Sequence, residues 1–365
     1  MTKLLIVDDS ALMRRLLTEI FQSAGDFDVA VARNGGEALA MLPTFAPDVV
    51  TLDVHMPGMD GLACLDRIMV QHPCPVVMVS SLTAEGAEET LEAMTLGAID
   101  FVPKPRGAIS LEIDDIAGEL VDKVRAAAQA RIPRTARLRD RVRAAGAGGL
   151  RHSRTHFTTA PPRLAPVSMR GEVFEPGLVL VGCSTGGPPA LDALLGALPA
   201  DFPWPILIAQ HMPASFTGAL ARRLDRMCAL TVQEVDKATP LLPGHAYVGR
   251  GDADLVLSRR GAALVALPAP SSPDHFWHPS VDRLVESAMR LVRPERLIGV
   301  LMTGMGTDGA SAMAKLKQDG GLTLAEAEST AVVWGMPGAL VKRDGASCVS
   351  PLHEIAADLA RLLPR

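Results

Sequence analysis

Short apolar runs alternate with amphipathic, helix-like segments along most of this chain, and this alternation restricts its fold more than any other feature. Within residues 3–126 the runs Leu4–Val7, Val49–Leu52 and Val76–Val79 are separated by segments in which apolar residues recur at helical spacing. The last two runs are apolar on both faces, as in strands that helices cover on both sides. The pattern predicts a parallel, doubly wound α/β sheet with functional groups at the carboxyl ends of its strands.

The same alternation returns from about residue 176 and predicts a second α/β domain over residues 176–365. Its predicted strands and helices are Leu178–Val181, Pro188–Leu198, Ile206–Ala209, Val281–Leu291 and Leu297–Met302. Between the predicted strand Ile206–Ala209 and the predicted helix Val281–Leu291, we expect residues 239–275 to form a segment rich in turns.

Residues 127–175 join the two domains and are rich in Arg, Ala, Pro and Gly, with few large apolar residues, which is typical of a flexible linker. The chain of 365 residues has a formal charge of −5, but residues 131–170 hold ten arginines and one acid, Asp140, so the remainder carries about −14. We therefore expect acidic globular domains that do not bind nucleic acid.

The sequence predicts neither a targeting segment nor a set of paired cysteines. The apolar run Leu4–Val7 leads directly into Asp8 and Asp9, which is too short and too acidic for a signal peptide, and no stretch approaches the roughly 18 apolar residues of a membrane helix. The five cysteines lack paired spacing, so neither disulfides nor a zinc site is predicted. These features favour a cytoplasmic protein without membrane insertion.

Acidic and basic side chains gather at strand ends in the first domain. Asp8 and Asp9 follow the first predicted strand, Asp53 follows the third, and Lys104 follows the run Ile99–Val102. Carboxylates that converge on one sheet edge can share Mg²⁺, and a lysine beside them can neutralise a phosphoryl group. The alternative is that these acids are ordinary strand-end residues or helix caps.

The segments VDDS, LDVHMPGMDG, MVSS and FVPKP occur in the order found in receiver domains of two-component signalling, which residues 1–126 resemble. The resemblance implies a flavodoxin-like (βα)5 fold with Asp53 as the phospho-acceptor. It also implies Mg²⁺ binding by Asp8, Asp9, Asp53 and the main-chain carbonyl of His55, and phospho-switch roles for Ser80, Phe101 and Lys104. Many related receivers carry an acid or amide at the position of His55, but the implied metal contact there is made by the backbone.

In the second domain, the predicted strand GLVLVG runs into a Gly-Cys-Ser-Thr-Gly-Gly turn and then into a helix opened by Pro188. This strand–turn–helix context is that of a GxSxG nucleophile elbow, with Ser184 as the exposed nucleophile. At the helix N-terminus the N–H groups of Thr185 and Gly186 lack intrahelical partners and can stabilise an oxyanion. The motif alone also fits a phosphate-binding turn.

Two further residues that follow predicted strands are candidates for the base and the orienting carboxylate of a triad with Ser184. His211 lies at the end of the predicted strand in ILIAQHMP, and Asp308 lies in the loop that follows the predicted strand in LIGVLMTGMGTDGA. If these strands neighbour the one before Ser184, a base and an orienting carboxylate reach the nucleophile, although a single strand-end histidine is often structural. The order Ser, His, Asp along the chain differs from that of ordinary α/β-hydrolases, but geometry defines a triad.

The segments CSTGG, QHMP, HPSVD, MTGMGTDGA and WGMPG make residues 176–361 resemble the catalytic domain of the CheB family, the chemotaxis-specific protein-glutamate methylesterases. The resemblance implies a doubly wound, Rossmann-like esterase domain without a cofactor, in which Ser184 is the nucleophile, His211 the base and Asp308 its partner. Thr185 and Met305 would line the site. Cys183 replaces the usual alanine, and His278 stands where the family commonly has arginine at a substrate contact.

The same resemblance implies the reaction and the partners. Methyl-accepting chemoreceptors would be the substrates, demethylated at glutamate methyl esters and deamidated at glutamines, and a chemotaxis histidine kinase would be the phosphoryl donor. We expect a monomer in which the unphosphorylated receiver covers the Ser184 cleft and phosphorylation of Asp53 weakens that docking.

Two other functions remain open at this point. The segment from Gly304 to Gly309 spells GxGxxG after a strand and Glu326 follows, which suggests a dinucleotide-binding oxidoreductase. Against it, Asp308 would place a carboxylate beside the pyrophosphate. The second alternative is a non-enzymatic module that docks through exposed apolar residues such as Met212 and Phe216.

Overall fold

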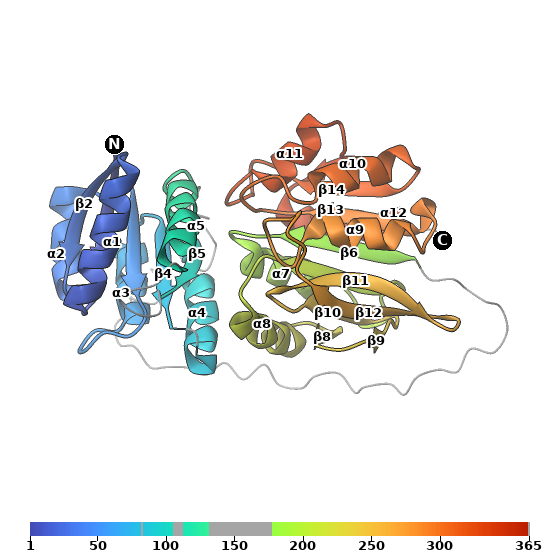
Figure 1. Ribbon diagram of the computed structural model, residues 1–365, viewed down its shortest axis with the longest axis horizontal. Coiled ribbons are helices and arrows are strands. Elements are labelled where there is room, and N and C mark those ends of the chain that lie inside the picture. The colour runs from blue at the N-terminus through green and yellow to red at the C-terminus, as the bar shows by residue number, and fades with distance from the viewer. Residues whose placement is uncertain (82, 105–111, 131–176, 364–365) are drawn as a thin grey trace, which may run out of the picture.

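The computed structural model describes residues 1–81, 83–104, 112–130 and 177–363, which form two α/β domains (Figure 1). The first domain contains β1 (Thr2–Val7), α1 (Ala11–Ala24), β2 (Phe27–Ala32), α2 (Gly35–Phe45), β3 (Val49–Asp53), α3 (Gly61–Gln71), β4 (Val76–Ser80), α4 (Ala84–Leu96), β5 (Asp100–Pro103) and α5 (Glu112–Ala128). Helix α5 ends inside the predicted linker, most of which lies outside the described residues, so the domain boundaries stay a prediction.

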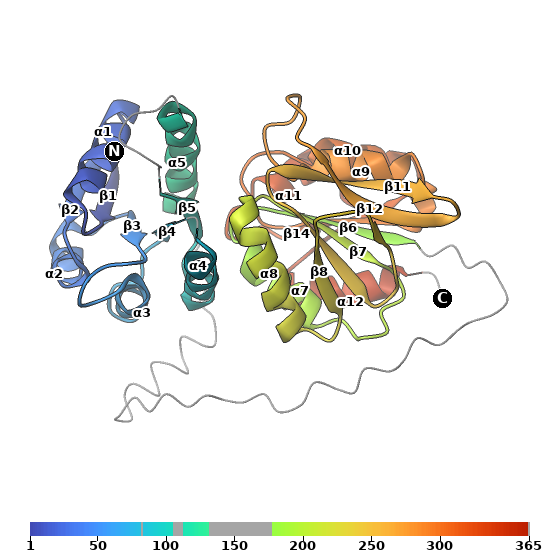
Figure 2. The same cartoon turned by 60° about the horizontal axis from the view of Figure 1, so that its bottom comes forward.

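The first sheet is parallel throughout, with strand order β2-β1-β3-β4-β5. Alternate residues of each strand enter different cores, because successive side chains of a strand point to opposite faces. Leu4 and Ile6 pack into one buried cluster, and Leu5 and Val7 pack into another. Helices α1 and α5 contact each other on one side, and α2, α3 and α4 form a second layer (Figure 2). The predicted doubly wound sheet is confirmed.

The second domain is built on a seven-stranded parallel sheet of order β15-β14-β13-β6-β7-β10-β8. Its helices and strands are β6 (Leu178–Cys183), α7 (Gly187–Gly196), β7 (Ile206–Gln210), α8 (Ala214–Met227), β8 (Thr231–Val235), β10 (His245–Gly249), α9 (Val281–Met289), η1 (Pro294–Arg296), β13 (Leu297–Leu301), α10 (Ala310–Gln318), β14 (Leu322–Glu326), α11 (Met336–Lys342), β15 (Cys348–Ser350) and α12 (Leu352–Leu362). The chain proceeds from β6 to β7 on one side and later returns to β13 on the other. The loops after β6, β7 and β13 therefore surround a topological switch point, where α/β sheets place ligands.

The expectation of turns over residues 239–275 is wrong. This segment contains β10 and a three-stranded antiparallel sheet of β9 (Thr239–Pro240), β11 (Ala253–Arg260) and β12 (Ala263–Pro270). Its Gly and Pro residues belong mainly to strand ends and connections, and their density obscured the strands between them. Among the described residues, no helix combines the length and the apolar character that crossing a bilayer requires.

The two domains are in direct contact. Helix α4 of the first domain packs on α7 and α8 of the second, and Arg223 on α8 donates to the carbonyl of Leu91 at 2.6 Å and pairs with Asp192. The rings of Phe101 on β5 and Phe216 on α8 lie 4.3 Å apart, and both are buried. The first domain thus covers part of the edge at which β6 and β7 end (Figure 1).

Candidate functional site

The acidic cluster of the first domain forms as predicted. Carboxylate oxygens of Asp8, Asp9 and Asp53 all lie within 4.8 Å of one another. The Nζ of Lys104 is 2.7 Å from Asp53 Oδ2 and 3.4 Å from Asp8 Oδ2. Asp8 and Asp9 follow β1, Asp53 ends β3 and Lys104 follows β5. These strands are parallel in one sheet, so their carboxyl ends lie at the same edge.

The electrostatics of this cluster suit a divalent cation. Burial, and then the neighbouring charge of Asp53, raise the pKa of Asp8, and the buried Oδ2 of Asp8 accepts no hydrogen bond. Burial alone would lower the pKa of Lys104, but its hydrogen bond to Asp53 and the two carboxylate charges outweigh burial and raise it. The charged lysine offsets only part of the carboxylate repulsion, so the three acids form a fitting set of oxygen ligands for Mg²⁺.

The other residues that the receiver resemblance implied lie around this cluster with different contacts. The main-chain N–H of His55 donates to Asp53 Oδ1 at 3.1 Å, whereas its side chain faces Glu89 at 3.2 Å. The buried hydroxyl of Ser80 donates to the carbonyl of Gly86 on α4 at 3.2 Å. Phe101 is turned inward against the second domain. The structure therefore joins Lys104 to Asp53, but it does not bring Ser80 or Phe101 into contact with Asp53.

In the second domain, the turn after β6 presents Ser184 at the carboxyl edge of the sheet. Its N–H donates to the carbonyl of Thr303 at 3.0 Å, and its own carbonyl accepts from Gly187 at 2.7 Å. Gly186 has a φ of +77°, which favours glycine, and a Cβ on Gly187 would lie 1.8 Å from Oε1 of Gln210. The two glycines therefore permit the sharp passage from strand to helix.

The groups predicted to bind an oxyanion flank Ser184. The main-chain N–H groups of Thr185 and Gly186 donate no hydrogen bond within the described parts of the chain, and they precede the first turn of α7. The loop of Met305 is adjacent, since a Cβ on Gly304 would lie 2.8 Å from Cβ of Ser184. These positions allow two free donors and the Met305 loop to face an acyl group bound at Ser184.

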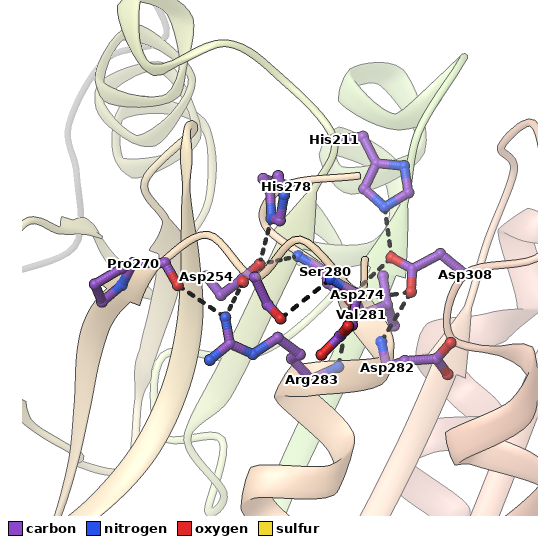
Figure 3. Close-up of polar contacts among 11 residues, drawn as sticks. His211, Asp254, Pro270, Asp274, His278, Ser280, Val281, Asp282, Arg283 and Asp308 are labelled. Atoms are coloured by element: carbon purple, nitrogen blue, oxygen red, sulfur yellow. Dashed lines mark hydrogen bonds and ion pairs between the residues drawn. The ribbon is translucent and has the colours of Figure 1, made fainter. Parts of the chain in front are cut away.

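His211 and Asp308 form the contact expected of a base and its orienting acid (Figure 3). His211 Nε2 lies 2.8 Å from Asp308 Oδ2, and both side chains are nearly buried. Asp308 Oδ2 also accepts from the N–H of Val281 at 2.7 Å, and Oδ1 accepts from the N–H of Asp282 at 3.0 Å and from Ser280 Oγ at 3.1 Å. The carboxylate thus occupies the N-terminus of α9, where negative charge is favoured.

These contacts determine the ionisation of Asp308. Burial alone would raise its pKa, but the hydrogen bond and charge of His211, followed by the N–H groups of Val281 and Asp282, outweigh burial and hold the pKa below its ordinary value. Asp308 is therefore an anion at neutral pH. An anion at Nε2 stabilises a positive charge on His211 and directs the other ring nitrogen away from it.

Ser184 and His211 are adjacent but not hydrogen-bonded to each other. Cys183 and Gln210 are paired at the ends of β6 and β7, the N–H of His211 donates to Cys183 O at 3.1 Å, and Gln210 Nε2 bridges the carbonyls of Ser184 and His211 at 3.0 Å each. The Nδ1 atom of His211 is buried and has no hydrogen-bond partner among the described residues. It is the ring nitrogen left to accept the proton of Ser184, and such bonds often tighten only when substrate is bound.

A second polar network, which the sequence did not reveal, supports this arrangement (Figure 3). The buried carboxylate of Asp254 on β11 accepts from the N–H of Ser280 at 2.7 Å, contacts His278 Nδ1 at 2.9 Å and pairs with Arg283. Ser280 is also the N-cap of α9, accepting from Arg283 N at 3.3 Å. Ser280 was detectable as a cap before an apolar helix, whereas Asp254 lies in the segment expected to be turns.

Cys183 and His278, the two departures from the family pattern, have clear contacts. Cys183 is fully buried, its Sγ lies 3.0 Å from Gln210 Oε1, and burial raises its pKa strongly, so its thiol is a packed group beside the nucleophile. His278 lines a cleft of about 360 Å³ beside His211, Met212 and Trp277. Glu119 and Lys123 of the first domain line the same cleft.

The structure opposes both alternatives to an esterase. Glu326, expected to bind a ribose in an oxidoreductase, is fully buried and accepts hydrogen bonds from Thr303 N at 2.8 Å and Thr330 Oγ1 at 3.0 Å. Asp308, within the glycine-rich segment, is engaged by His211. The docking module required exposed Met212 and Phe216, but both are buried. That expectation is wrong because Phe216 on α8 packs against Phe101 of the first domain, and Met212, in the loop before α8, is 4% exposed.

Comparison with known proteins agrees with this geometry. Residues 179–359 match the family model described as CheB methylesterase, and residues 4–113 match the response regulator receiver domain. A protein-glutamate methylesterase/protein-glutamine glutaminase from Rhodopseudomonas palustris is 55% identical over 98% of this chain and 97% of its own length. A relative of the same name from Rhodospirillum rubrum is 54% identical over 100% of this chain and 97% of its own. The crystal structure of the Thermotoga maritima CheB methylesterase catalytic domain aligns with a TM-score of 0.50 at 36% identity, covering 52% of this chain and 99% of that one.

Proposed function

This chain belongs to the CheB family of receiver-linked methylesterases, and we propose that Ser184, His211 and Asp308 carry out its reaction on chemoreceptors. The enzyme is a phosphorylation-activated protein-glutamate methylesterase and protein-glutamine glutaminase. The observation that most supports the assignment of residues is the bond from His211 Nε2 to anionic Asp308, which leaves Nδ1 free beside the strand that carries Ser184.

In the proposed acylation step, Ser184 Oγ forms a bond to the ester carbonyl carbon while its proton passes to His211 Nδ1. The negative oxygen is stabilised by the N–H groups of Thr185 and Gly186 next to the Met305 loop. The C–O bond to methoxide then breaks, and His211 returns the proton so that methanol leaves. With a glutamine substrate the same step breaks the C–N bond and releases ammonia.

In the deacylation step, water replaces the leaving group. His211 Nδ1 takes a proton from the water, whose oxygen attacks the acyl carbon, and the proton is then returned to Ser184 Oγ as the glutamate product departs. Asp308 stays ionised throughout and stabilises the imidazolium that forms in each step. The catalytic residues therefore act without a cofactor in this scheme.

Phosphorylation would occur at Asp53 with a chemotaxis histidine kinase as donor. Asp8, Asp9, Asp53 and the main-chain carbonyl of His55 would hold Mg²⁺, which supplies charge neutralisation for phosphoryl transfer when bound. The phosphoryl group adds charge and acceptor oxygens that Lys104 and Ser80 can bind. Because the Ser80 hydroxyl now bonds to Gly86, engaging the phosphoryl group requires it to release α4, the helix that packs on the second domain.

The receiver is proposed to inhibit by occupying the substrate's approach. Helix α5 supplies Glu119 and Lys123 to the cleft beside His211, and Asp100 Oδ2 accepts from Thr185 Oγ1 at 2.5 Å next to the nucleophile. A receptor helix that must present a side chain to Ser184 would compete with these contacts. Phosphorylation then raises activity by shifting the population towards undocked domains.

Labelling of the active-site serine tests the assignment. A fluorescent organophosphonate should label the wild-type chain at one site, and Ser184→Ala should abolish both the label and methanol release from methylated receptors. Ser215→Ala, which changes another serine of the same domain, is the matched control and should keep the label. Labelling of Ser184→Ala at wild-type level would show that a different nucleophile carries the reaction.

A further inference from the structure

An indole ring is stacked against the proposed base. The rings of Trp277 and His211 are stacked with centroids 5.5 Å apart and planes inclined by 9°. Trp277 lies in the loop before α9 and is half-buried beside the cleft that also exposes His211. Neither the proposed triad nor the proposed oxyanion donors include this residue.

The position of His211 is incompletely fixed without Trp277. Its backbone is held by the bond to Cys183 O, and Nε2 is held by Asp308. Rotation about the Cβ–Cγ bond remains the motion that would swing Nδ1 out of line with Ser184. A flat ring packed parallel to the imidazole opposes that rotation, because turning would drive the imidazole edge into the indole.

Trp277 is itself held on several sides. The ring of Phe276 meets it edge-on, with centroids 4.9 Å apart and an angle of 83°. A Cβ placed on Gly306 would lie 3.6 Å from Trp277 Nε1, so the indole also borders the loop that carries Met305. The next residue in the chain, His278, is bound to the buried Asp254. These contacts hold the indole where it can restrain His211.

The stacking also fits the charge that His211 acquires. In the proposed reaction the imidazole becomes a cation when it takes the proton of Ser184. The face of an indole is the aromatic surface that most favours a neighbouring cation. The same contact would therefore hold the ring in place and favour its protonated form.

We propose that Trp277 is a positioning residue for His211, which holds Nδ1 in line with Ser184 and favours the imidazolium formed during catalysis. This inference rests on the proposed function, since it assigns Trp277 a role only if His211 is the base.

Steady-state kinetics of the full-length chain test the proposal. With p-nitrophenyl acetate as the ester, Trp277→Leu should lower kcat at least tenfold and change KM less than twofold. Trp277→Phe keeps a ring face on His211 and should recover most of kcat. Leu242→Ala changes an exposed apolar side chain of the same domain that does not line this cleft, and it should keep kcat within twofold. Wild-type kcat in Trp277→Leu, or no recovery in Trp277→Phe, would overturn the proposal.

A spectroscopic measurement covers the case in which Trp277→Leu does not fold. In wild-type protein labelled at histidine, ring currents of a stacked indole should shift the carbon-bound ring protons of His211 upfield, and His211→Gln identifies these signals. Unshifted His211 signals would overturn the proposal. Ser184→Ala separates the two levels of inference: full activity in that variant defeats the proposed function, whereas an inactive Ser184→Ala with a fully active Trp277→Leu defeats only the role of Trp277.

Discussion

Asp308 shows how single residues build this site. It accepts from His211, Ser280, Val281 and Asp282, so its two oxygens receive four hydrogen bonds. Three of these donors belong to the start of α9, a segment far from Asp308 in the sequence. His211 is therefore oriented by a carboxylate that is itself fixed by a helix N-terminus, so both the charge and the position of Asp308 matter to the proposed base.

Asp308→Asn should lower kcat on the order of 10³- to 10⁴-fold with little change in KM, because an amide disfavours the tautomer and the imidazolium that catalysis requires. Methanol release from a methylated receptor measures this effect. Asp319→Asn, which changes an acid at the end of α10, is the control and should keep wild-type kcat. A loss of less than about tenfold in Asp308→Asn would indicate that Asp308 does not orient the base.

The ionisation of Asp254 should make the free energy of unfolding depend on pH. Burial alone would raise its pKa, but the bonds from His278, Ser280 N–H and Arg283 outweigh burial and lower it. A carboxyl group with a lowered pKa in the folded state contributes stability above its unfolded pKa of about 3.9, and that contribution is lost as pH falls through the folded value.

Asp254→Asn should therefore be less stable than wild type at pH 7, by about 3–5 kcal/mol as for a broken buried pair, and the difference should narrow below about pH 4. Thermal unfolding at a series of pH values measures the gap in Tm. A gap that stays constant from pH 7 to pH 3 would show that ionised Asp254 does not contribute this stability.

At the scale of helices and strands, the sequence predicted the parallel sheets well because buried strands are apolar on both faces. The strand-end positions of Asp53, Ser184, His211 and Asp308 followed from that pattern. The hairpin of β11 and β12 was missed even though residues 262–267 are all apolar, because the surrounding Pro and Gly residues favoured turns. Contacts that depend on how loops pack, such as those of Asp254 and Trp277, have no local sequence signal.

Helices α4 and α8 carry much of the contact between domains, and Arg223 is central to it. Arg223→Ala removes its bond to Leu91 O and its pairing with Asp192. Because this weakens docking, we expect activity without phosphorylation to rise about two- to tenfold while phosphorylated activity stays the same. Methanol release with and without a phosphodonor measures both. Arg290→Ala, on exposed α9 surface, should change neither, and an unchanged basal rate in Arg223→Ala would argue against docking through α8.

At the scale of the whole molecule, one buried apolar cluster joins the two domains, with Phe101 and Phe216 both in it. The receiver places Phe101 on α8, Asp100 on Thr185 and α5 beside the cleft, all from the face that includes β5. Lys104 follows the same strand and binds Asp53, the proposed phospho-acceptor. Lys104, which contacts the proposed phosphorylation site, is thus only a few residues along the chain from Asp100 and Phe101, which contact the second domain.

Removal of residues 1–126 should raise basal esterase activity, because the remaining chain lacks the α4, β5 and α5 contacts that cover the cleft. Activity is compared with that of the unphosphorylated full-length chain on the same methylated receptor, with Ser184→Ala in the shortened chain as the background control. Equal or lower activity of the shortened chain would rule out simple occlusion by the receiver.

Removal of divalent cations should prevent phosphorylation of the first domain without changing ester hydrolysis by the second. With EDTA, a phosphodonor should no longer activate the enzyme, because the Asp8, Asp9 and Asp53 cluster needs Mg²⁺ to accept a phosphoryl group. Hydrolysis of p-nitrophenyl acetate by the unphosphorylated chain should stay unchanged. A matching loss of basal hydrolysis would show that a metal ion takes part in the ester chemistry itself.

The contact between Asp100 and Thr185 limits how this enzyme can be recombined. A foreign receiver with an intact phosphorylation cluster would still accept phosphate, yet it would control the esterase only if its own β5 offered a carboxylate and an aromatic ring that match Thr185 and Phe216. A chimera without them would hydrolyse esters at a constant rate, whether or not it was phosphorylated. The two domains are therefore expected to have co-evolved as a matched pair rather than as exchangeable modules.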